Sequence, residues 1–361
     1  MYRGAVAHTG DLAAEAPISE KPELLWKFTG LNKGIHTASK SSPAVDDKAL
    51  YVGADNGYFY AFDRFDGRML WFFRARKSNF GIHSSPAVDG DTVYFGAYNG
   101  YLYALDKNTG ALKWRRKLGG SIGSSPVLFE DKIYIGVELA RPNRGFLAVV
   151  RRSDGKKVFY GAKFPEHTHA TPTIDERART VFIGANSGSF YMYDCDTGKL
   201  LFEFKSAGAI KSTAALSDKM VFFTSWDSNL YALDRGNLAL KWKVSIDNWS
   251  MSSPAVDESE GKVYFGSHDR HLYCVDLETG SKIWSFFPDA RIISSPVIAS
   301  AKGKRAKVVL FGADDDRLYM LDPADGKALW FGRLDGDGSS LPVLKDSVIY
   351  YSSNNSLYAF K

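Results

Sequence analysis

The sequence predicts an all-β fold made of eight similar units, and three observations lead to that prediction. A Ser-Ser-Pro element, or a degenerate form of it, recurs every 40 to 46 residues along the 361-residue chain. Within each unit, β-branched and aromatic residues alternate with a period of two, punctuated by Gly, Asn and Asp, which is typical of consecutive hairpins. No segment shows a convincing helical period. Four short strands fit this length, so we expect an eight-bladed β-propeller of four-stranded antiparallel blades.

The second unit, residues 84–114, shows the expected order of elements. "SSPAV" forms the first strand, and a turn at Asp89-Gly90 leads to the second strand, "TVYFGA". A turn at Asn99-Gly100 leads to the third strand, "YLYALD", and "KNTG" leads to the outer strand, "ALKW". The other units repeat this order within one predicted domain, 1–361. The blades are expected to start near residues 41, 84, 124, 170, 212, 252, 294 and 339.

The N-terminal part of the chain contains a strand that the last unit lacks. That unit ends at "SLYAF" before Lys361, without an outer strand, whereas "PELLWKF" (22–28) follows a lead-in segment (1–21) and precedes the first unit. An open ring would leave two apolar blade faces in water. We therefore expect residues 22–28 to form the outermost strand of the eighth blade and to close the ring.

The turn before each outer strand and the aromatic residue on that strand have a structural interpretation. An Asp and a Thr-Gly or Asp-Gly pair predict a tight turn in which Gly adopts a positive φ. The tryptophan that follows is expected to lie flat between neighbouring blades and to bury apolar area. Phe159 and Phe202 replace it in two units. The predicted blade-docking tryptophans are Trp26, Trp71, Trp114, Trp242, Trp284 and Trp330.

Composition narrows the classes of function. The net charge is +5, and no Lys/Arg run is dense enough to argue for nucleic acid. No apolar stretch reaches the ~18 residues of a membrane span. The opening "MYRGAVAHTG" lacks the apolar core of a signal peptide. Cys195 and Cys274 lie in different units, so we expect no disulfide between them.

The third and fourth strands resemble a known repeat. "ALDKNTGALKW" (Ala104–Trp114) is similar to the Ala-x-Asp-x-x-Thr-Gly-x-x-x-Trp repeat of the pyrroloquinoline-quinone (PQQ) propeller family, and variants of it recur in most units. The chain most resembles the non-enzymatic, BamB-like members of this family. That resemblance implies a periplasmic or cell-envelope scaffold that presents a rigid surface to outer-membrane assembly proteins. A monomer is compatible with this role.

The catalytic members of the family set a different expectation. They are known to hold PQQ beneath a disulfide between adjacent cysteines, with calcium ligated by Glu, Asn and Asp. This chain has no adjacent cysteine pair, and the calcium ligands cannot be mapped onto it. It also lacks a His-Glu-x-x-His motif. We therefore expect no catalytic residues, no metal and no cofactor, since the residues do not support PQQ with calcium.

Functional residues of a propeller are expected where the repeats differ, in the loops of one face. The positions before the inner strands, and the turns that share their face, are rich in basic and aromatic side chains. They predict a channel mouth that binds a small anionic molecule, a glycan or a quinone, as a redox accessory or sensor would. The alternative is a set of ordinary solvated loop residues. The candidate mouth residues are Lys40, His83, His169, Lys211, Trp226, His268, Arg270 and Arg291.

Three further features leave alternatives open. His83, His167 and His169 could form a metal site, but a His-x-His pair alone is a weak signal. The insertion Val137–Phe146 predicts a projecting loop whose Arg141, Pro142 and Arg144 contact a partner, or else a tolerated surface insertion. The stretch Ala299–Lys307 is interpreted as a solvated basic hairpin tip on the opposite face.

Overall fold

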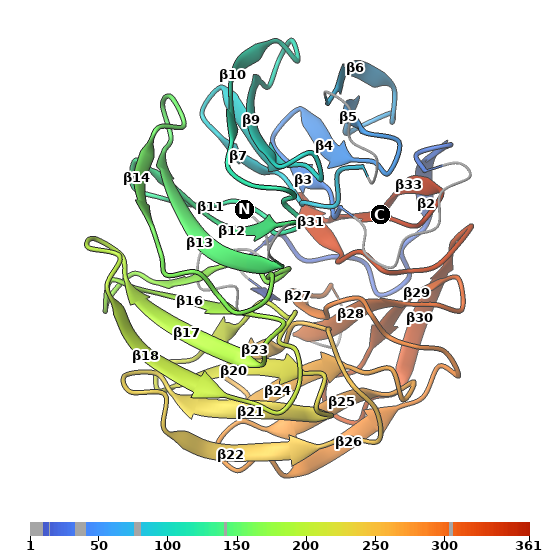
Figure 1. The fold of residues 1–361 in the computed structure, drawn as a ribbon. Coiled ribbons are helices and arrows are strands. Elements are labelled where there is room, and N and C mark those ends of the chain that lie inside the picture. Colours follow the sequence, from blue (N-terminus) through green and yellow to red (C-terminus); the bar gives the residue numbers. More distant parts are fainter. Residues whose placement is uncertain (1–9, 14, 33–40, 76–80, 141–142, 303–305) are drawn as a thin grey trace.

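The computed structural model describes residues 10–13, 15–32, 41–75, 81–140, 143–302 and 306–361. The elements assigned there are all strands, and they form eight antiparallel four-stranded sheets arranged in a ring, one of which gains a fifth strand (Figure 1). The predicted eight-bladed β-propeller is confirmed. Among these residues the structure contains no helix with the length and apolarity of a membrane span.

The innermost strand of each blade is short, and most second strands are fully buried. The inner strands are β3 (Ala44–Val45), β7 (Ala87–Asp89), β11 (Val127–Phe129), β15 (Thr173–Asp175), β19 (Ala215–Leu216), β23 (Ala255–Asp257), β27 (Val297–Ser300) and β31 (Val343–Lys345). The second strands are β4 (Ala49–Gly53), β8 (Thr92–Gly96), β12 (Lys132–Leu139), β16 (Thr180–Gly184), β20 (Met220–Ser225), β24 (Lys262–Gly266), β28 (Lys307–Ala313) and β32 (Val348–Ser352).

The two outer strands of each blade complete the sheet. The third strands are β5 (Tyr58–Asp63), β9 (Tyr101–Asp106), β13 (Arg144–Arg151), β17 (Ser189–Asp194), β21 (Asn229–Asp234), β25 (Leu272–Asp276), β29 (Arg317–Leu321) and β33 (Ser356–Phe360). The outermost strands are β6 (Met69–Arg74), β10 (Leu112–Lys117), β14 (Lys157–Tyr160), β18 (Leu200–Lys205), β22 (Leu240–Ser245), β26 (Lys282–Phe286), β30 (Ala328–Arg333) and β2 (Leu24–Thr29).

Burial explains why the strands differ in sequence. All five residues of β8, "TVYFG", are buried, because neighbouring blades cover both faces of the sheet there. The outermost strand of the same blade, β10, contains only exposed and half-buried residues, and its sequence, "LKWRRK", is correspondingly polar. The core therefore consists of the apolar layers between successive blades.

The ring closes as predicted. Strand β2 pairs antiparallel with β33, and Trp26 lies opposite Ala359, so the N-terminal strand supplies the outermost strand of the eighth blade. The strand begins two residues later than the predicted Pro22 and ends at Thr29. Both ends of the chain thereby contribute to one blade.

The lead-in segment contributes a strand that the sequence did not predict. Strand β1 (Asp11–Leu12) pairs parallel with β27, on the edge of blade seven that faces the channel. Further along, the N–H of Ile18 donates to Ser300 O at 2.9 Å, and Ile18 is fully buried against blades seven and eight. The segment therefore fastens the inner edge of blade seven before the chain reaches blade eight.

The stretch Ala299–Lys307 is not simply a solvated hairpin tip. Ala299 is buried in β27, and the first residue of β28, Lys307, places its ammonium 2.7 Å from the fully buried carboxylate of Asp257 in blade six. Strand β27, "VIAS", extends the inner strand of blade seven to Ser300. The extra length therefore provides the edge with which the N-terminal segment pairs.

Five of the blade-docking tryptophans make the same contact with the next blade. Each indole N–H donates, at 3.0–3.2 Å, to the carbonyl of the first residue of the last turn in that blade; this residue follows an Asp in four blades and Arg151 in blade three. For example, Trp71 donates to Lys107 O, and its ring covers Gly110. The sixth, Trp330, packs edge-on against Phe360 of blade eight, with ring centroids 5.5 Å apart.

The same turn residue also forms ion pairs between blades on the face opposite the channel mouth. Lys107 Nζ lies 2.8 Å from Asp46 of blade one, and Arg152 lies 3.1 Å from Asp89 of blade two. Blade four has Cys195 at this position. The cross-blade ion pair there is made by Arg179.

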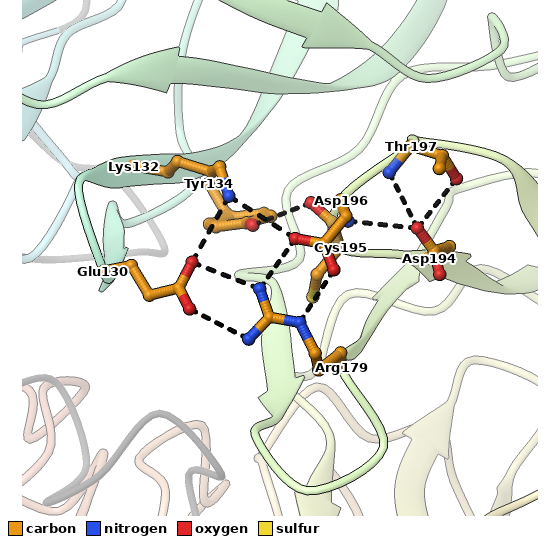
Figure 2. Close-up of polar contacts among 8 residues, drawn as sticks. All are labelled: Glu130, Lys132, Tyr134, Arg179, Asp194, Cys195, Asp196 and Thr197. Atoms are coloured by element: carbon orange, nitrogen blue, oxygen red, sulfur yellow. Dashed lines mark hydrogen bonds and ion pairs between the residues drawn. The ribbon is translucent and has the colours of Figure 1, made fainter.

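Arg179 links blades three and four through two carboxylates (Figure 2). Its guanidinium lies 2.9 Å from Glu130, on the first hairpin of blade three, and 2.7 Å from Asp196, on the last turn of blade four. Lys132 also approaches both carboxylates. In place of a basic side chain at position 195, the backbone carbonyl of Cys195 accepts a hydrogen bond from Tyr134 Oη at 3.1 Å.

Candidate functional site

The channel mouth is a cavity of about 280 Å³ to which all eight blades contribute. Each blade supplies the second residue of its Ser-Ser-Pro element. In blade eight the equivalent pair is Ser340-Leu341, one residue later than the predicted start. The eight contributed side chains are those of Ser42, Ser85, Ser125, Thr171, Thr213, Ser253, Ser295 and Leu341.

Hydrogen bonds between successive blades order this ring. The N–H of Ser42 donates to Ser85 Oγ at 3.0 Å, and the N–H of Ser85 donates to Ser125 Oγ at 3.0 Å. The pattern recurs between other blades and crosses the ring closure, where the N–H of Leu341 donates to Ser42 Oγ at 3.0 Å. The Ser-Ser element therefore satisfies backbone groups near the axis.

The first serine of the element ties its strand to the rest of its own blade. Ser84 Oγ accepts the N–H of Gly96, and the equivalent contact occurs in blades one, three, six and seven. These serines are fully buried or nearly so. Their hydroxyl groups are used internally, unlike those of the second serines, which face the cavity.

A polar wall stands over blades one to four. His83 Nε2 lies 3.0 Å from Asp55 Oδ1, and the His83 ring packs against Tyr98 with centroids 4.6 Å apart. His169 Nδ1 lies 3.4 Å from Glu138 Oε1, and the hydroxyl of Ser121 donates to Glu138 Oε2 at 2.9 Å. Two carboxylate–imidazole pairs thus flank the aromatic ring of Tyr98.

Gly123 leaves room for this wall. A Cβ there would lie 3.0 Å from Tyr98 Oη, 3.1 Å from His169 Nδ1 and 3.3 Å from Glu138 Oε1. Contacts this tight would force the three polar groups apart. The glycine before the third inner strand therefore permits polar atoms from three blades to converge.

Burial sets the protonation of the wall. It lowers the pKa of His169 to about 3, helped by the nearby charge of Lys211, so the imidazole is neutral at pH 7. Burial also raises the pKa of Glu138, against hydrogen bonds from Ser121 and the backbone of Gly123. It lowers the pKa of Lys211, and the carboxylate of Glu138 partly offsets that effect.

A cluster of aromatic rings lies beside the cavity on blades five and six. Lys211 Nζ lies 3.7 Å from the ring centroid of Trp226, in a cation–π contact. Trp226 packs on Trp249 with centroids 4.4 Å apart, and Trp249 stacks on His268 at 3.4 Å. Trp226 keeps 36% of its surface exposed. This rim cluster, Lys211, Trp226, Trp249 and His268, joins the cavity to the outer surface.

The remaining arc of the mouth is apolar near the axis and acidic outside it. Met251, Ile293 and Leu341 line the cavity there. Arg291 points to Asp314, 2.9 Å away, and Arg270 pairs with Asp289 at 2.7 Å. Burial raises the pKa of the Asp314 carboxyl to about 6, and the charge of Asp337 adds to that effect.

The structure thus brings some of the candidate mouth residues together and separates others. His83, His169 and Lys211 line the cavity, while Trp226 and His268 form part of the rim cluster. Arg270 and Arg291 do not line the cavity and are engaged in ion pairs. Lys40 lies outside the described residues.

The predicted partner loop is mostly a hairpin. Val137–Leu139 continues β12 and Arg144–Phe146 begins β13, with Val137 paired to Phe146 and both side chains buried. The alternating apolar pattern of this insertion explains the extension. Arg144 is exposed at the start of β13, and Arg141 and Pro142 lie outside the described residues.

Sequence reasoning missed Glu138, Asp55 and Trp249 as site residues. Glu138 lies within the insertion, between the apolar residues Val137 and Leu139. On a strand, this alternation places the Glu138 side chain on the opposite face from its two neighbours, and that was the available signal. Trp249 lies a few residues before the sixth inner strand, in the part of the repeat that faces the channel mouth, and that position was the available signal. Asp55 carried no signal in the sequence, because many turns in the chain contain Asp.

The residues do not fit a metal-dependent quinone site. Within the described part of the chain, no group of three or more His, Cys, Asp and Glu side chains is placed to hold a metal ion. The rings of His167 and His169 meet edge-on with centroids 5.4 Å apart, and His167 contacts Asn143 instead. Cys195 and Cys274 are both buried free thiols.

Comparison with known proteins gives a family and a fold. A family model described as outer membrane protein assembly factor BamB matches residues 13–244, 165–286 and 268–361. A search among curated proteins found no significant match.

Three solved structures are similar to this chain over almost its whole length. BamB from Moraxella catarrhalis has 17% identity and a TM-score of 0.75, and the match covers 94% of this chain and 99% of that one. A europium-containing methanol dehydrogenase has 14% identity, a TM-score of 0.82 and coverages of 100% and 97%. Quinohemoprotein alcohol dehydrogenase from Comamonas testosteroni has 15% identity, a TM-score of 0.78 and coverages of 98% and 79%. At identities this low, the structural similarity shows a shared fold alone.

Proposed function

This chain belongs to the PQQ-like propeller family whose model is described as outer membrane protein assembly factor BamB, and on that premise we propose that it is a non-catalytic scaffold of the cell envelope. It binds a protein partner of the outer-membrane assembly kind. The contact surface is the rim of the channel mouth on blades five and six. Fold alone does not distinguish binding from catalysis in this family, so the proposal depends on the site.

One observation carries the proposal, namely the rim cluster of Lys211, Trp226, Trp249 and His268. Tryptophan is among the residues most enriched at the energetic centres of protein interfaces. Trp226 is partly exposed, yet the stack on Trp249 and the contact with Lys211 hold its ring in place. An ordered aromatic surface loses little side-chain entropy when a partner covers it.

The rigidity of the ring supports the same role. Hydrogen bonds at the Ser-Ser elements join the inner strands, and Trp–carbonyl bonds join the outer strands of successive blades. A partner would therefore meet a preformed surface, for which the ordering cost of binding is low.

Substitution of Trp226 tests the proposal. The binding partners are the outer-membrane assembly components that co-purify with the full chain from the envelope of its source. The Trp226→Ala protein should bind them at least about tenfold more weakly, as expected when an aromatic hot spot is removed. Phe331→Ala is the matched control, because Phe331 is 46% exposed on β30, away from the rim cluster. Its affinity should be unchanged. Equal binding by both variants, or recovery of no assembly component, would contradict the proposal.

A further inference from the structure

The floor of the channel mouth carries hydroxyl groups with unused donor capacity. Ser42, Ser85 and Ser253 each accept a backbone N–H from a neighbouring blade, and their side chains are at most 5% exposed. Within the described residues, none of the second-position hydroxyls donates a hydrogen bond. A serine hydroxyl carries one O–H donor besides its acceptor lone pairs. Because these side chains line the cavity, the unused O–H groups are available to whatever lies on the axis.

Two more hydroxyls of the cavity, on blades five and eight, have still fewer partners. Thr213 is 3% exposed and lines the cavity, and in the described part of the chain its hydroxyl neither accepts nor donates a hydrogen bond. Ser339 Oγ is a buried cavity-lining atom with no hydrogen-bond partner among those residues. A buried polar group without a partner costs free energy. A ligand that accepts hydrogen bonds would satisfy both.

Lys211 adds a positive charge at the same place. It is the only Lys or Arg that lines the cavity in the described residues, and its ammonium faces the ring of Trp226 and makes no ion pair there. The carboxylates on the opposite wall are already engaged, since Asp55 faces His83 and Glu138 faces His169 and Ser121. The ammonium therefore has no carboxylate at ion-pair distance among the described residues, and the charge of Glu138 acts on it only from further away.

We propose that the mouth binds a small oxyanion, a carboxylate or phosphate group, on the propeller axis. The ring hydroxyls donate to it from the floor, and Lys211 donates from the wall. Charge-assisted hydrogen bonds of this kind are stronger than neutral ones. The apolar arc of Met251 and Ile293 takes the remainder of a larger ligand, as in many small-molecule sites. This site shares Lys211 with the rim cluster, but it does not require the protein partner proposed above.

The test is a calorimetric titration of the full chain with inorganic phosphate and, separately, with acetate, at constant ionic strength. We expect saturable binding of at least one anion in the ~mM range, given the few atoms of these probes. Lys211→Gln should weaken it by about tenfold or more, because it removes a charge-assisted hydrogen bond. Lys243→Gln is the matched control, since Lys243 is exposed on the outer strand of the same blade.

Thr213→Val separates binding from folding. Valine has nearly the shape of threonine, and the hydroxyl it removes makes no bond within the described residues, so the melting temperature should hold while anion affinity falls several-fold. If either anion binds and its affinity falls in both Lys211→Gln and Thr213→Val, the site is supported, and the anion that binds more tightly shows which oxyanion it prefers. No saturable heat with either anion up to about 50 mM, or affinity unchanged in either variant, would overturn it.

Discussion

At the scale of single residues, the repeat is a set of contacts between a tryptophan and the turn of the next blade. Gly110 has a φ of +73°, and a Cβ there would lie 2.6 Å from Cε3 of Trp71. The glycine is thus required both by backbone conformation and by the approaching ring. In blade five, Leu238 occupies this position with a φ of 58°, facing a blade whose outer strand has Phe202 in place of tryptophan.

Substitution of Gly110 should show both requirements. Gly110→Ala is expected to lower the free energy of unfolding by about 2–4 kcal/mol, because the cost of a strained φ adds to the cost of a clash with the Trp71 indole. Gly90→Ala is the control, since Gly90 has a φ of +55° but nothing within 4 Å of its Cβ position. It should lose only about 1 kcal/mol. Chemical denaturation measures both values, and equal losses would contradict the packing role of the glycine.

The buried imidazole of His169 predicts a pH dependence of stability. Its pKa is about 3 in the folded state, below the ordinary value of 6.5, so the unfolded chain binds a proton that the folded chain does not. The free energy of unfolding should therefore fall as the pH drops below 6.5. Between pH 7 and pH 5, the free energy of unfolding should fall by about 1–2 kcal/mol for this reason.

The variant His169→Gln isolates this effect from the other titrating groups. Its free energy of unfolding should decline less steeply than that of the unmodified protein over the same range, by about 1 kcal/mol. Glu138, whose pKa is raised by burial, acts in the opposite direction and remains in both proteins. Parallel pH profiles for the two proteins would show that His169 is not held neutral by burial.

At the scale of elements, the sequence predicted what repeats and missed what occurs once. The closing strand β2 was predictable because "LLWKF" resembles the outer strand of every other blade. Strand β1 has two residues and no counterpart in the repeat, so no periodic signal marked it. The long hairpin of β12 and β13 was mistaken for a loop, because its extra length was judged against the short turns of other blades.

The same reasoning applies to the candidate site. His83, His169 and Lys211 were found because they occupy one position of the repeat, before an inner strand, and that position faces the channel. Glu138 escaped notice because it arrives from the neighbouring hairpin. Its approach depends on how two strands pair, which periodicity alone does not reveal.

The N-terminal segment should stabilise the ring without affecting the mouth. Ile18→Ala is expected to lower the free energy of unfolding by about 2–4 kcal/mol, because Ile18 is fully buried against blades seven and eight. Leu25→Ala, at a position in β2 that is 50% exposed, should change it by less than about 0.5 kcal/mol. Thermal and chemical denaturation check both values. A negligible effect of Ile18→Ala would mean that the segment is not integral to the fold.

At the scale of the whole molecule, the ring is joined at three radii. Hydroxyl–backbone bonds join it near the axis, apolar layers join it between blades, and Trp–carbonyl bonds and ion pairs join it at the turns. The channel mouth is the place where this repetition is broken, with an imidazole–carboxylate wall on one side and an apolar arc on the other. Function is assigned to the mouth because its side chains are not required by the repeat.

The measurement that most directly tests the central claim, a propeller that binds rather than catalyses, is a titration of the purified chain with PQQ, with and without Ca²⁺. Intrinsic tryptophan fluorescence reports binding, and reduction of a dye in the presence of simple alcohols reports turnover. The account predicts no turnover under either condition, and any PQQ binding through its carboxylates should not depend on Ca²⁺. Saturable, Ca²⁺-dependent binding accompanied by alcohol oxidation would contradict it and would make the chain a dehydrogenase.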